Sequence, residues 1–248
     1  MSEQPTQIAA SILTADFGHL DRVVRKLERA GVDRLHLDVM DGHFVPNLTF
    51  GPVVTQAFRR LTDLPIDIHL MIDEPGRYID RFLDGEPQTV TIHVEAREPD
   101  EMKRATLARI RERGAEAGLA VSPGTGVESL EPYVGSVDLV MVMTIEPGFG
   151  GQRFMAAAAP KMTEATALFA AHGFDVVIHV DGGVNRDTAM AAGAWGADVC
   201  VVGSALFQRG QDAADEVKLA KERAAEGRRL GPDGLEAVRP AAALKRGA

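Results

Sequence analysis

Short apolar runs alternate with capped, amphipathic stretches along the whole chain, and this alternation constrains the fold more than any other feature. The apolar runs are expected to form eight strands, at residues 7–12, 35–39, 66–71, 89–94, 117–121, 139–143, 176–180 and 199–202. The stretches between and after them are expected to form helices, at residues 17–30, 52–61, 75–83, 100–113, 127–134, 156–172, 186–192 and 213–225. Strands that alternate with helices indicate parallel βαβ units. Eight such units over about 220 residues predict an α/β fold, the (β/α)8 TIM barrel, whereas an open doubly wound sheet seldom needs so many.

No linker or shift in composition divides the chain, so one catalytic domain is expected over residues 1–226. This length suits the fold, because single (β/α)8 barrels usually have about 250 residues. Residues 227–248 mix Arg, Gly, Pro and Ala without periodicity. We expect them to be a loosely ordered C-terminal extension or a short packed one.

The composition excludes several classes of function. A formal net charge of −9 argues against a nucleic-acid-binding protein, which usually has a basic excess. It does not exclude a phosphorylated small molecule, because backbone N–H groups can bind an anion without lysine. Cys200 is the only cysteine, so an intrachain disulfide is impossible. No apolar run reaches the roughly 20 residues that span a bilayer, and residues 1–6 lack a signal-peptide pattern. We therefore expect a cytoplasmic protein with no membrane partner.

The stretch of residues 35–46, LHLDVMDGHFVP, carries the first chemical signal. Successive strand side chains point to opposite faces, so His36 and Asp38 share one face and the aliphatic residues take the other. The Asp41-Gly42 pair then ends the strand. A His and an Asp on one face at a strand end could both bind a divalent metal. They could equally be a buried histidine hydrogen-bonded to a neighbouring aspartate, and this stretch alone does not decide between the two.

The ends of the other strands carry further polar residues, where the active site of such a barrel lies. In chain order these positions hold Ser11, His36 with Asp38, His69, His93 with Glu95, Ser122, Met143, Asp181 and Ser204. Strands two and seven are three steps apart around an eight-stranded ring, so Asp38 and Asp181 are expected on roughly opposite sides of the mouth. Two acid–base groups on opposite faces of one carbon are what inversion by proton transfer requires.

A metal site is predicted from the same positions. His36, Asp38, His69 and Asp181 form a mixed nitrogen and oxygen set that suits Zn²⁺, Fe²⁺, Mn²⁺ or Co²⁺. As a Lewis acid, such a metal would stabilise an enediolate left by proton removal, by several kcal/mol.

Glycine-rich turns follow strands six, seven and eight: Gly148-Phe149-Gly150-Gly151, Gly182-Gly183 and Gly203-Ser204. One glycine pair alone is more often a tight turn. Three on adjacent loops favour a phosphate site, because many barrels bind phosphate at the loops after strands seven and eight.

Two other enzyme classes are disfavoured. All six lysines fall in expected helices or in the tail, so no strand end offers an amine for a Schiff base. No Gly-x-Gly-x-x-Gly follows a strand, which argues against a nicotinamide enzyme.

These motifs resemble the ribulose-phosphate 3-epimerase family over nearly the whole chain. The matching stretches are ASILTADF from residue 10, HLDVMDGHFVPNLTFGP from 36, DIHLM from 67, IHVEA from 92, VMTIEPGFGGQRF from 142, VDGGVN from 180 and VGSALF from 202. The resemblance implies an isomerase that interconverts D-ribulose 5-phosphate and D-xylulose 5-phosphate in the pentose phosphate pathway and the Calvin cycle. It also implies a homo-oligomer, either a dimer or a hexamer.

The resemblance assigns roles to individual residues. It implies that Asp38 and Asp181 are the acid–base catalysts, and that His36, Asp38, His69 and Asp181 hold the metal. Met40, Met71 and Met143 would form an apolar wall beside it, although methionines read alone favour core packing. The residues implied to contact the sugar phosphate are Ser11, His69, Gly148, Phe149, Gly150, Gly151, Gly182, Gly183, Gly203 and Ser204.

Two alternative functions remain open. One is the related epimerase of D-allulose 6-phosphate, which shares the histidines and aspartates but tends to replace a glycine of the phosphate loops. The other is a catalytically silent barrel that binds sugar phosphates, although no expected site residue is missing here.

The chain departs from the family at two places. His179 stands where the family more often has a carboxylate, on the same face as Asp181 and one layer deeper. It could support the metal ligands or be a hydrogen-bonded core histidine. The tail beyond Gly227 is longer than the family needs.

Overall fold

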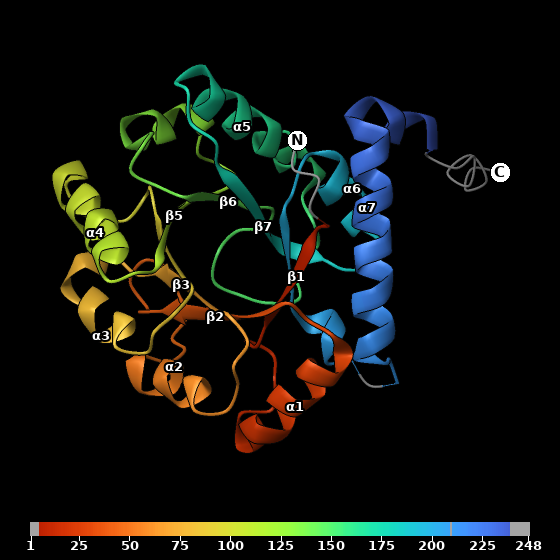
Figure 1. Ribbon diagram of the computed structural model, residues 1–248, viewed down its shortest axis with the longest axis horizontal. Coiled ribbons are helices and arrows are strands. Elements are labelled where there is room, and N and C mark those ends of the chain that lie inside the picture. The colour runs from red at the N-terminus through yellow and green to blue at the C-terminus, as the bar shows by residue number, and fades with distance from the viewer. Residues whose placement is uncertain (1–4, 209, 239–248) are drawn as a thin grey trace.

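The computed structural model describes residues 5–208 and 210–238. Its centre is a closed barrel in which every neighbouring pair of strands is parallel and β1 pairs with β8 (Figure 1). The strands are β1 (Gln7–Ser11), β2 (Arg34–Met40), β3 (Ile66–Met71), β4 (Thr89–His93), β5 (Glu116–Val121), β6 (Leu139–Met143), β7 (Val177–Val184) and β8 (Val199–Val202). The predicted (β/α)8 barrel is confirmed, and the open-sheet alternative is excluded.

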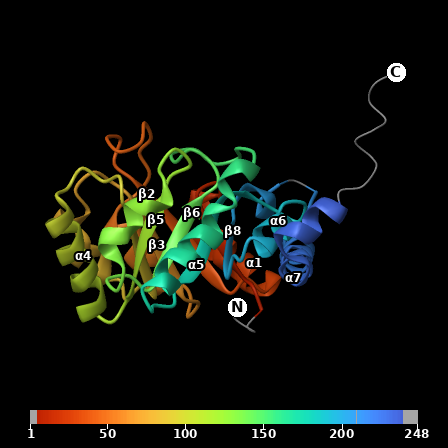
Figure 2. The same ribbon diagram turned by 90° about the horizontal axis from the view of Figure 1, so that it is seen from above.

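Helices surround the barrel along its length (Figures 1 and 2). The α-helices are α1 (Leu20–Ala30), α2 (Pro52–Arg59), α3 (Ile79–Leu83), α4 (Asp100–Glu112), α5 (Lys161–Ala171), α6 (Ala189–Ala194) and α7 (Ala213–Val238). Short 3-10 helices are η1 (Phe17–His19), η2 (Pro75–Arg77), η3 (Val127–Tyr133), η4 (Ala156–Ala158) and η5 (Ser204–Leu206). Helix α7 packs against α1 and α6, where the barrel closes.

Prolines explain two of the differences from the predicted helices. The segment at 127–134 forms only the 3-10 helix η3, with Pro132 inside it. The segment at 156–172 starts as η4, and α5 begins only after Pro160. Proline lacks the N–H group that an α-helix interior needs, so it is tolerated only near a helix start. Periodicity had predicted single helices through these sites.

The last helix is longer than predicted. Helix α7 continues past residue 225 to Val238, with non-helical backbone at Gly231 (φ 67°, ψ 176°), directly before Pro232. Residues 227–238, which were expected to be either loosely ordered or a short packed extension, are helical apart from Gly231, and the rest of that segment, 239–248, lies outside the described residues. The boundary of the catalytic domain at residue 226 stays a prediction.

The two faces of each strand have different surroundings, as the period of two requires. On β2, Leu35, Leu37 and Val39 belong to the main hydrophobic core outside the barrel. His36 and Asp38 alternate with them and are also buried, at 0% and 4% exposure. The barrel interior therefore holds polar groups that are cut off from water, which is costly unless they pair with one another.

Strand β7 carries an irregularity that shapes one side of the mouth. Its register against β8 shifts between Asp181 and Val184, so the strand runs beyond the predicted end at residue 180. Gly182 and Gly183 form the bulge with φ of 122° and 67°. A Cβ on Gly182 would lie 2.7 Å from the backbone nitrogen of Ile145, and one on Gly183 would clash with the backbone of Phe154. Only glycine fits this turn, so the glycine pair is required sterically.

None of the helices in the described parts of the chain has both the length and the apolar character needed to cross a membrane.

Candidate active site

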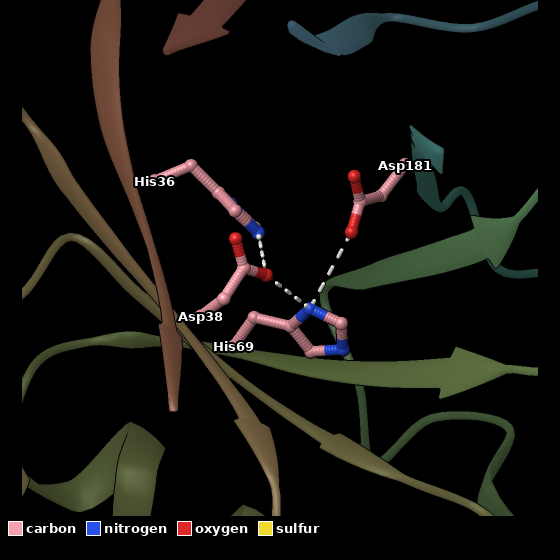
Figure 3. A group of neighbouring side chains, drawn as sticks. All are labelled: His36, Asp38, His69 and Asp181. Carbon is pink, nitrogen blue, oxygen red and sulfur yellow. Dashed lines mark hydrogen bonds and ion pairs between the residues drawn. The ribbon is translucent and has the colours of Figure 1, made fainter. Parts of the chain in front are cut away.

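Four titratable side chains meet inside the mouth of the barrel (Figure 3). His36 and Asp38 come from β2, His69 from β3 and Asp181 from β7. One nitrogen or oxygen atom of each lies within 4.8 Å of the corresponding atoms of the other three. The structure thus brings together the four residues that the sequence analysis selected as a metal-binding set.

The strand register explains this convergence. Asp38 and His69 are direct partners in the β2–β3 ladder, so their inward side chains lie side by side. His36 is two residues before Asp38 and lies one layer deeper on the same face. Asp181 comes from β7, and its carboxylate and that of Asp38 approach the same atom, His69 Nδ1, from two sides (Figure 3). The two carboxylates therefore flank one small space.

Asp38 is the most connected group of the four. Its Oδ1 lies 3.2 Å from His69 Nδ1 and 3.4 Å from His36 Nε2. Its Oδ2 accepts a hydrogen bond of 2.7 Å from the Ser11 hydroxyl. His69 Nδ1 also lies 3.6 Å from Asp181 Oδ2. Ser11, which was expected to contact the sugar phosphate, therefore orients a carboxylate of the site in this structure.

The pKa values show that the site favours positive charge. Burial lowers the pKa of His69, but Asp181 and Asp38 outweigh it and raise that pKa to about 9. Burial raises the pKa of Asp38, yet the neighbouring imidazoles of His36 and His69 hold it far below its ordinary range. The two carboxylates thus favour positive charge in the space between them.

The donor set fits a divalent metal. Ligands of Zn²⁺ lie about 2.0–2.2 Å from the ion, so two ligands of one ion are at most about 4.4 Å apart. The observed limit of 4.8 Å is close to this spacing. Among the described residues, His36 Nε2 has no hydrogen-bond partner although it is fully buried and directed at Asp38. A buried imidazole nitrogen without a partner is costly, and a metal bond would satisfy it.

A cavity of about 430 Å³ opens above these side chains. Asp38 and Asp181 line it, whereas His36 and His69 are fully buried beneath it. His69 was also expected to contact the substrate, and that role stays a prediction. The carboxylates are therefore the polar groups of the set that a ligand in the cavity can reach.

Three methionines line the same cavity: Met40, Met71 and Met143. Met40 and Met71 pack with Val45 in one apolar cluster. Met143 packs with Ile145 and Met141 in another. The expected apolar wall thus lies beside the carboxylates, and its thioethers are soft, apolar neighbours that offer no acid–base group.

The glycine-rich loops form another part of the cavity wall. All the predicted positions there line it, namely Gly148, Phe149, Gly150, Gly151, Gly182, Gly183, Gly203 and Ser204. Gly148 and Gly151 have φ of 123° and 77°, so these turns too use backbone that other residues rarely adopt. Bare backbone therefore faces the cavity on this side, as a site for an anion requires.

Sequence reasoning missed two features of this wall. Arg153 also lines the cavity and is the one positively charged side chain among the described residues that do so. Asn47, from the loop after β2, donates from Nδ2 to the carbonyl of Gly148 at 2.7 Å and so ties the two sides of the mouth together. The position of Arg153 directly after the GFGGQ motif could have indicated that it lines the cavity. The contact between Asn47 and Gly148 joins residues 101 positions apart, and no sequence pattern indicates it.

His179 lies away from the cavity. It is fully buried on β7, and burial with the charges of Arg34 and His36 lowers its pKa well below the ordinary value. Its Nδ1 has no hydrogen-bond partner in the described part of the chain, so the structure does not show the fully hydrogen-bonded core histidine that was one of the two alternatives.

Comparisons with known proteins agree with this geometry. Residues 7–207 match the model of the "Ribulose-phosphate 3 epimerase family". A ribulose-phosphate 3-epimerase of Bacillus subtilis (strain 168) is 44% identical over 202 residues, which cover 81% of this chain and 92% of the relative. A chloroplastic ribulose-5-phosphate-3-epimerase of Arabidopsis thaliana is 40% identical over 211 residues, covering 85% of this chain and 74% of the relative.

A solved structure supports the fold alone. The 3-hexulose-6-phosphate synthase of Salmonella typhimurium superposes with a TM-score of 0.68 at 15% identity. The match covers 90% of this chain and 100% of the synthase. At that identity it indicates a shared barrel and nothing about the reaction.

Proposed function

This chain belongs to the ribulose-phosphate 3 epimerase family, and from that premise we propose that it interconverts D-ribulose 5-phosphate and D-xylulose 5-phosphate. It is an enzyme of the epimerase type. The observation that carries the proposal is the pair of carboxylates, Asp38 and Asp181, on two sides of one small space at the floor of the cavity.

The two aspartates would perform the proton transfers. One removes the hydrogen from C3 of the sugar on one face, which leaves a planar 2,3-enediolate. The other delivers a proton to C3 from the opposite face, and the configuration inverts. The reverse reaction exchanges the two roles. General acid–base catalysis of this kind typically contributes about 10²–10⁴-fold to the rate.

Their surroundings suit these roles. Ser11 and His69 hold the two oxygens of Asp38 in place, and the lowered pKa of Asp38 keeps it in the ionised form that a base requires. Asp181 is more exposed, at 14% of its side chain, and reaches the cavity from β7. The methionine wall excludes water near the carboxylates, which strengthens their electrostatic interactions.

His36, Asp38, His69 and Asp181 are the residues that would hold one divalent metal, with Zn²⁺, Fe²⁺, Mn²⁺ and Co²⁺ as candidates. When bound, the metal would act as a Lewis acid and stabilise the negative charge that proton removal leaves on the sugar oxygens. Chelation should abolish activity, and one of these four ions should restore it. Full activity in demonstrably metal-free protein would refute this part of the proposal.

The glycine wall would hold the phosphate group. Its support is the bulge at Gly182-Gly183 and the turns at 148–151 and 203–204, which present backbone to the cavity within reach of Arg153. Backbone N–H groups and one arginine suit a phosphate dianion better than a neutral group. A sugar of five carbons would then lie between this wall and the carboxylates.

The deciding experiment is turnover by purified protein. D-ribulose 5-phosphate and D-allulose 6-phosphate are offered separately, and kcat/KM is compared. We expect the five-carbon substrate to be preferred. A preference for allulose 6-phosphate would assign the related activity, and binding of either sugar without turnover would identify a silent barrel. The expected homo-oligomer is tested on the same sample by light scattering.

A further inference from the structure

A chain of hydrogen bonds leads from His69 away from the cavity. His69 Nε2 lies 2.8 Å from His93 Nε2, and His93 Nδ1 lies 3.0 Å from Glu95 Oε2. Both imidazoles are fully buried, and the Glu95 side chain is 23% exposed. The sequence analysis noted His93 and Glu95 at the end of β4 and gave them no role. Neither residue lines the cavity, so neither is placed to touch a ligand there.

The order of donors and acceptors along this chain has a fixed direction. His69 turns Nδ1 toward Asp38 and Asp181, so Nδ1 is the atom that a metal would bind. A metal-bound Nδ1 has no proton, and the ring must then carry its proton on Nε2. That Nε2–H donates to His93 Nε2, which must accept. The proton of neutral His93 is then on Nδ1, and it donates to the Glu95 carboxylate.

We propose that His93 and Glu95 are positioning residues that hold His69 in the Nε2–H tautomer and so keep its Nδ1 free for the metal. This inference rests on the metal site of the proposed function. Partners of this kind orient metal ligands, and their loss typically weakens metal binding about 10–100-fold.

Glu95 is itself held as an ionised acceptor. Its Oε1 accepts the backbone N–H of Ser122 at 2.7 Å, so both of its oxygens accept hydrogen bonds. Burial raises the pKa of Glu95, but hydrogen bonds from His93, Thr125 and Ser122 outweigh it and lower the pKa to about 2. An ionised carboxylate cannot donate, so it forces the His93 proton onto Nδ1.

The loop that holds Glu95 is also fixed. Lys161 Nζ donates to the carbonyls of Ser122 and Pro123 at 3.0 and 2.7 Å, and to that of Thr125. The ring of Phe44 covers His93, with 4.7 Å between ring centroids. These contacts hold Glu95 and His93 in place, and so they maintain the order of donors and acceptors along the hydrogen bonds from Glu95 to His69.

The other histidine ligand has no such support. Within the described residues, His36 Nδ1 lacks a hydrogen-bond partner. Changes at Glu95 should therefore act on His69 alone and leave His36 as it is.

Glu95→Gln is the sharpest variant, because the amide keeps the shape and replaces one acceptor oxygen by a donor. If the amide NH2 faces His93, then His93 Nδ1 must accept and its Nε2 must donate. His69 Nε2 then accepts, and its proton moves to Nδ1, where it opposes the metal. The matched control is Glu98→Gln on the same loop. Glu98 also accepts a hydrogen bond from a backbone N–H, that of Gly76, but it takes no part in the hydrogen bonds that link His69, His93 and Glu95.

The first measurement is the affinity for Co²⁺, by competition with a chromophoric chelator. We expect Glu95→Gln to bind Co²⁺ about 10–100-fold more weakly than the wild type, with Glu98→Gln unchanged. His93→Phe, which leaves His69 Nε2–H without an acceptor, should weaken binding similarly. Equal affinities for wild type and Glu95→Gln would overturn the positioning role. Absence of Co²⁺ binding by the wild type would instead refute the metal site itself.

The second measurement needs no variant. Nitrogen-15 NMR of the Zn²⁺-bound wild type distinguishes protonated from unprotonated imidazole nitrogens. We expect His69 to carry its proton on Nε2 and His93 on Nδ1. A proton on Nε2 of His93 would contradict the inference even if every variant bound metal weakly, because a merely structural role leaves the tautomer free.

Discussion

The two halves of the barrel mouth are built by different means. Strands β2–β4 and the turn after β4 supply three histidines and the carboxylates Asp38 and Glu95, and side-chain hydrogen bonds hold all of these groups except His36. Strands β6–β8 supply glycine turns with positive φ, and apart from Asp181 the wall there is mostly backbone and apolar side chains. In the first half, the charged groups are buried and joined by hydrogen bonds. In the second half, glycines leave the main chain exposed to the cavity.

Because the two halves of the mouth are built differently, different kinds of substitution should impair the function of each. In the network half, the chemistry depends on which atom holds a proton or a metal, so isosteric changes should be damaging. In the glycine half, function depends on the absence of a Cβ and of negative charge, so added atoms should be damaging. Asp181 connects the two, because it is a network residue that sits directly before the glycine bulge.

The largest effect is expected from removing a carboxylate charge. Asp38→Asn and Asp181→Asn should each lower kcat in both directions by about 10²–10⁴-fold, the contribution of one acid–base group. Wild-type product made in D2O should carry deuterium at C3 from the first turnover, since the two faces use different protons. Mass spectrometry of early product tests this. Retention of the substrate's own C3 hydrogen would mean that a single base acts.

The next effect concerns the metal. His69→Ala should lose the bound metal and activity together while the barrel still folds, because His69 belongs to the polar interior and not to the main hydrophobic core. Metal analysis and circular dichroism measure both. His179→Ala is the control, since it also empties a fully buried histidine site of the barrel interior. If both variants lost metal equally, loss would reflect a damaged barrel and not a missing ligand.

On the glycine half, Gly151→Asp should raise KM for the sugar phosphate about 10–100-fold, since like charges repel and each 1.4 kcal/mol is tenfold. Gly151 has φ of 77° and no atom within 4 Å of an added Cβ. Gly173→Asp is the matched control, with φ of 80°, equal space and a position after α5 away from the cavity. Steady-state kinetics distinguish them, and an unchanged KM in Gly151→Asp would place the phosphate elsewhere.

The smallest effect is expected where the halves meet. Asn47→Ala removes the bond from Asn47 Nδ2 to the carbonyl of Gly148. We expect a loss of about 0.5–1.5 kcal/mol in the free energy of unfolding, the usual contribution of one such bond. Urea denaturation measures it, and KM should rise only slightly. If Asn47→Ala lowered kcat as much as the aspartate variants do, the contact between the two halves would be needed for catalysis as well as for stability.

Much of the fold could be predicted because strand signals are local. The segments at 66–71, 139–143 and 199–202 have the predicted ends, and in the last two the apolar run is bounded on both sides by a polar residue or glycine. Helix starts were less predictable. Periodicity does not show that Pro160 delays α5 or that Tyr78 separates η2 from α3. Nor does composition show that α7 continues to Val238, because that helix is stabilised by packing on α1 and α6.

By itself, the sequence determined the order of the eight units and which residues of a strand share one face. These follow from the period of two, which places His36 and Asp38 on one face whatever surrounds them. Only the tertiary structure decided which atoms meet. The β7 bulge, the His69–His93–Glu95 chain and the contact between Asn47 and Gly148 join segments that lie apart along the chain or across the barrel. Closure of the barrel sets these distances, and no local pattern encodes a distance between strands that are not neighbours.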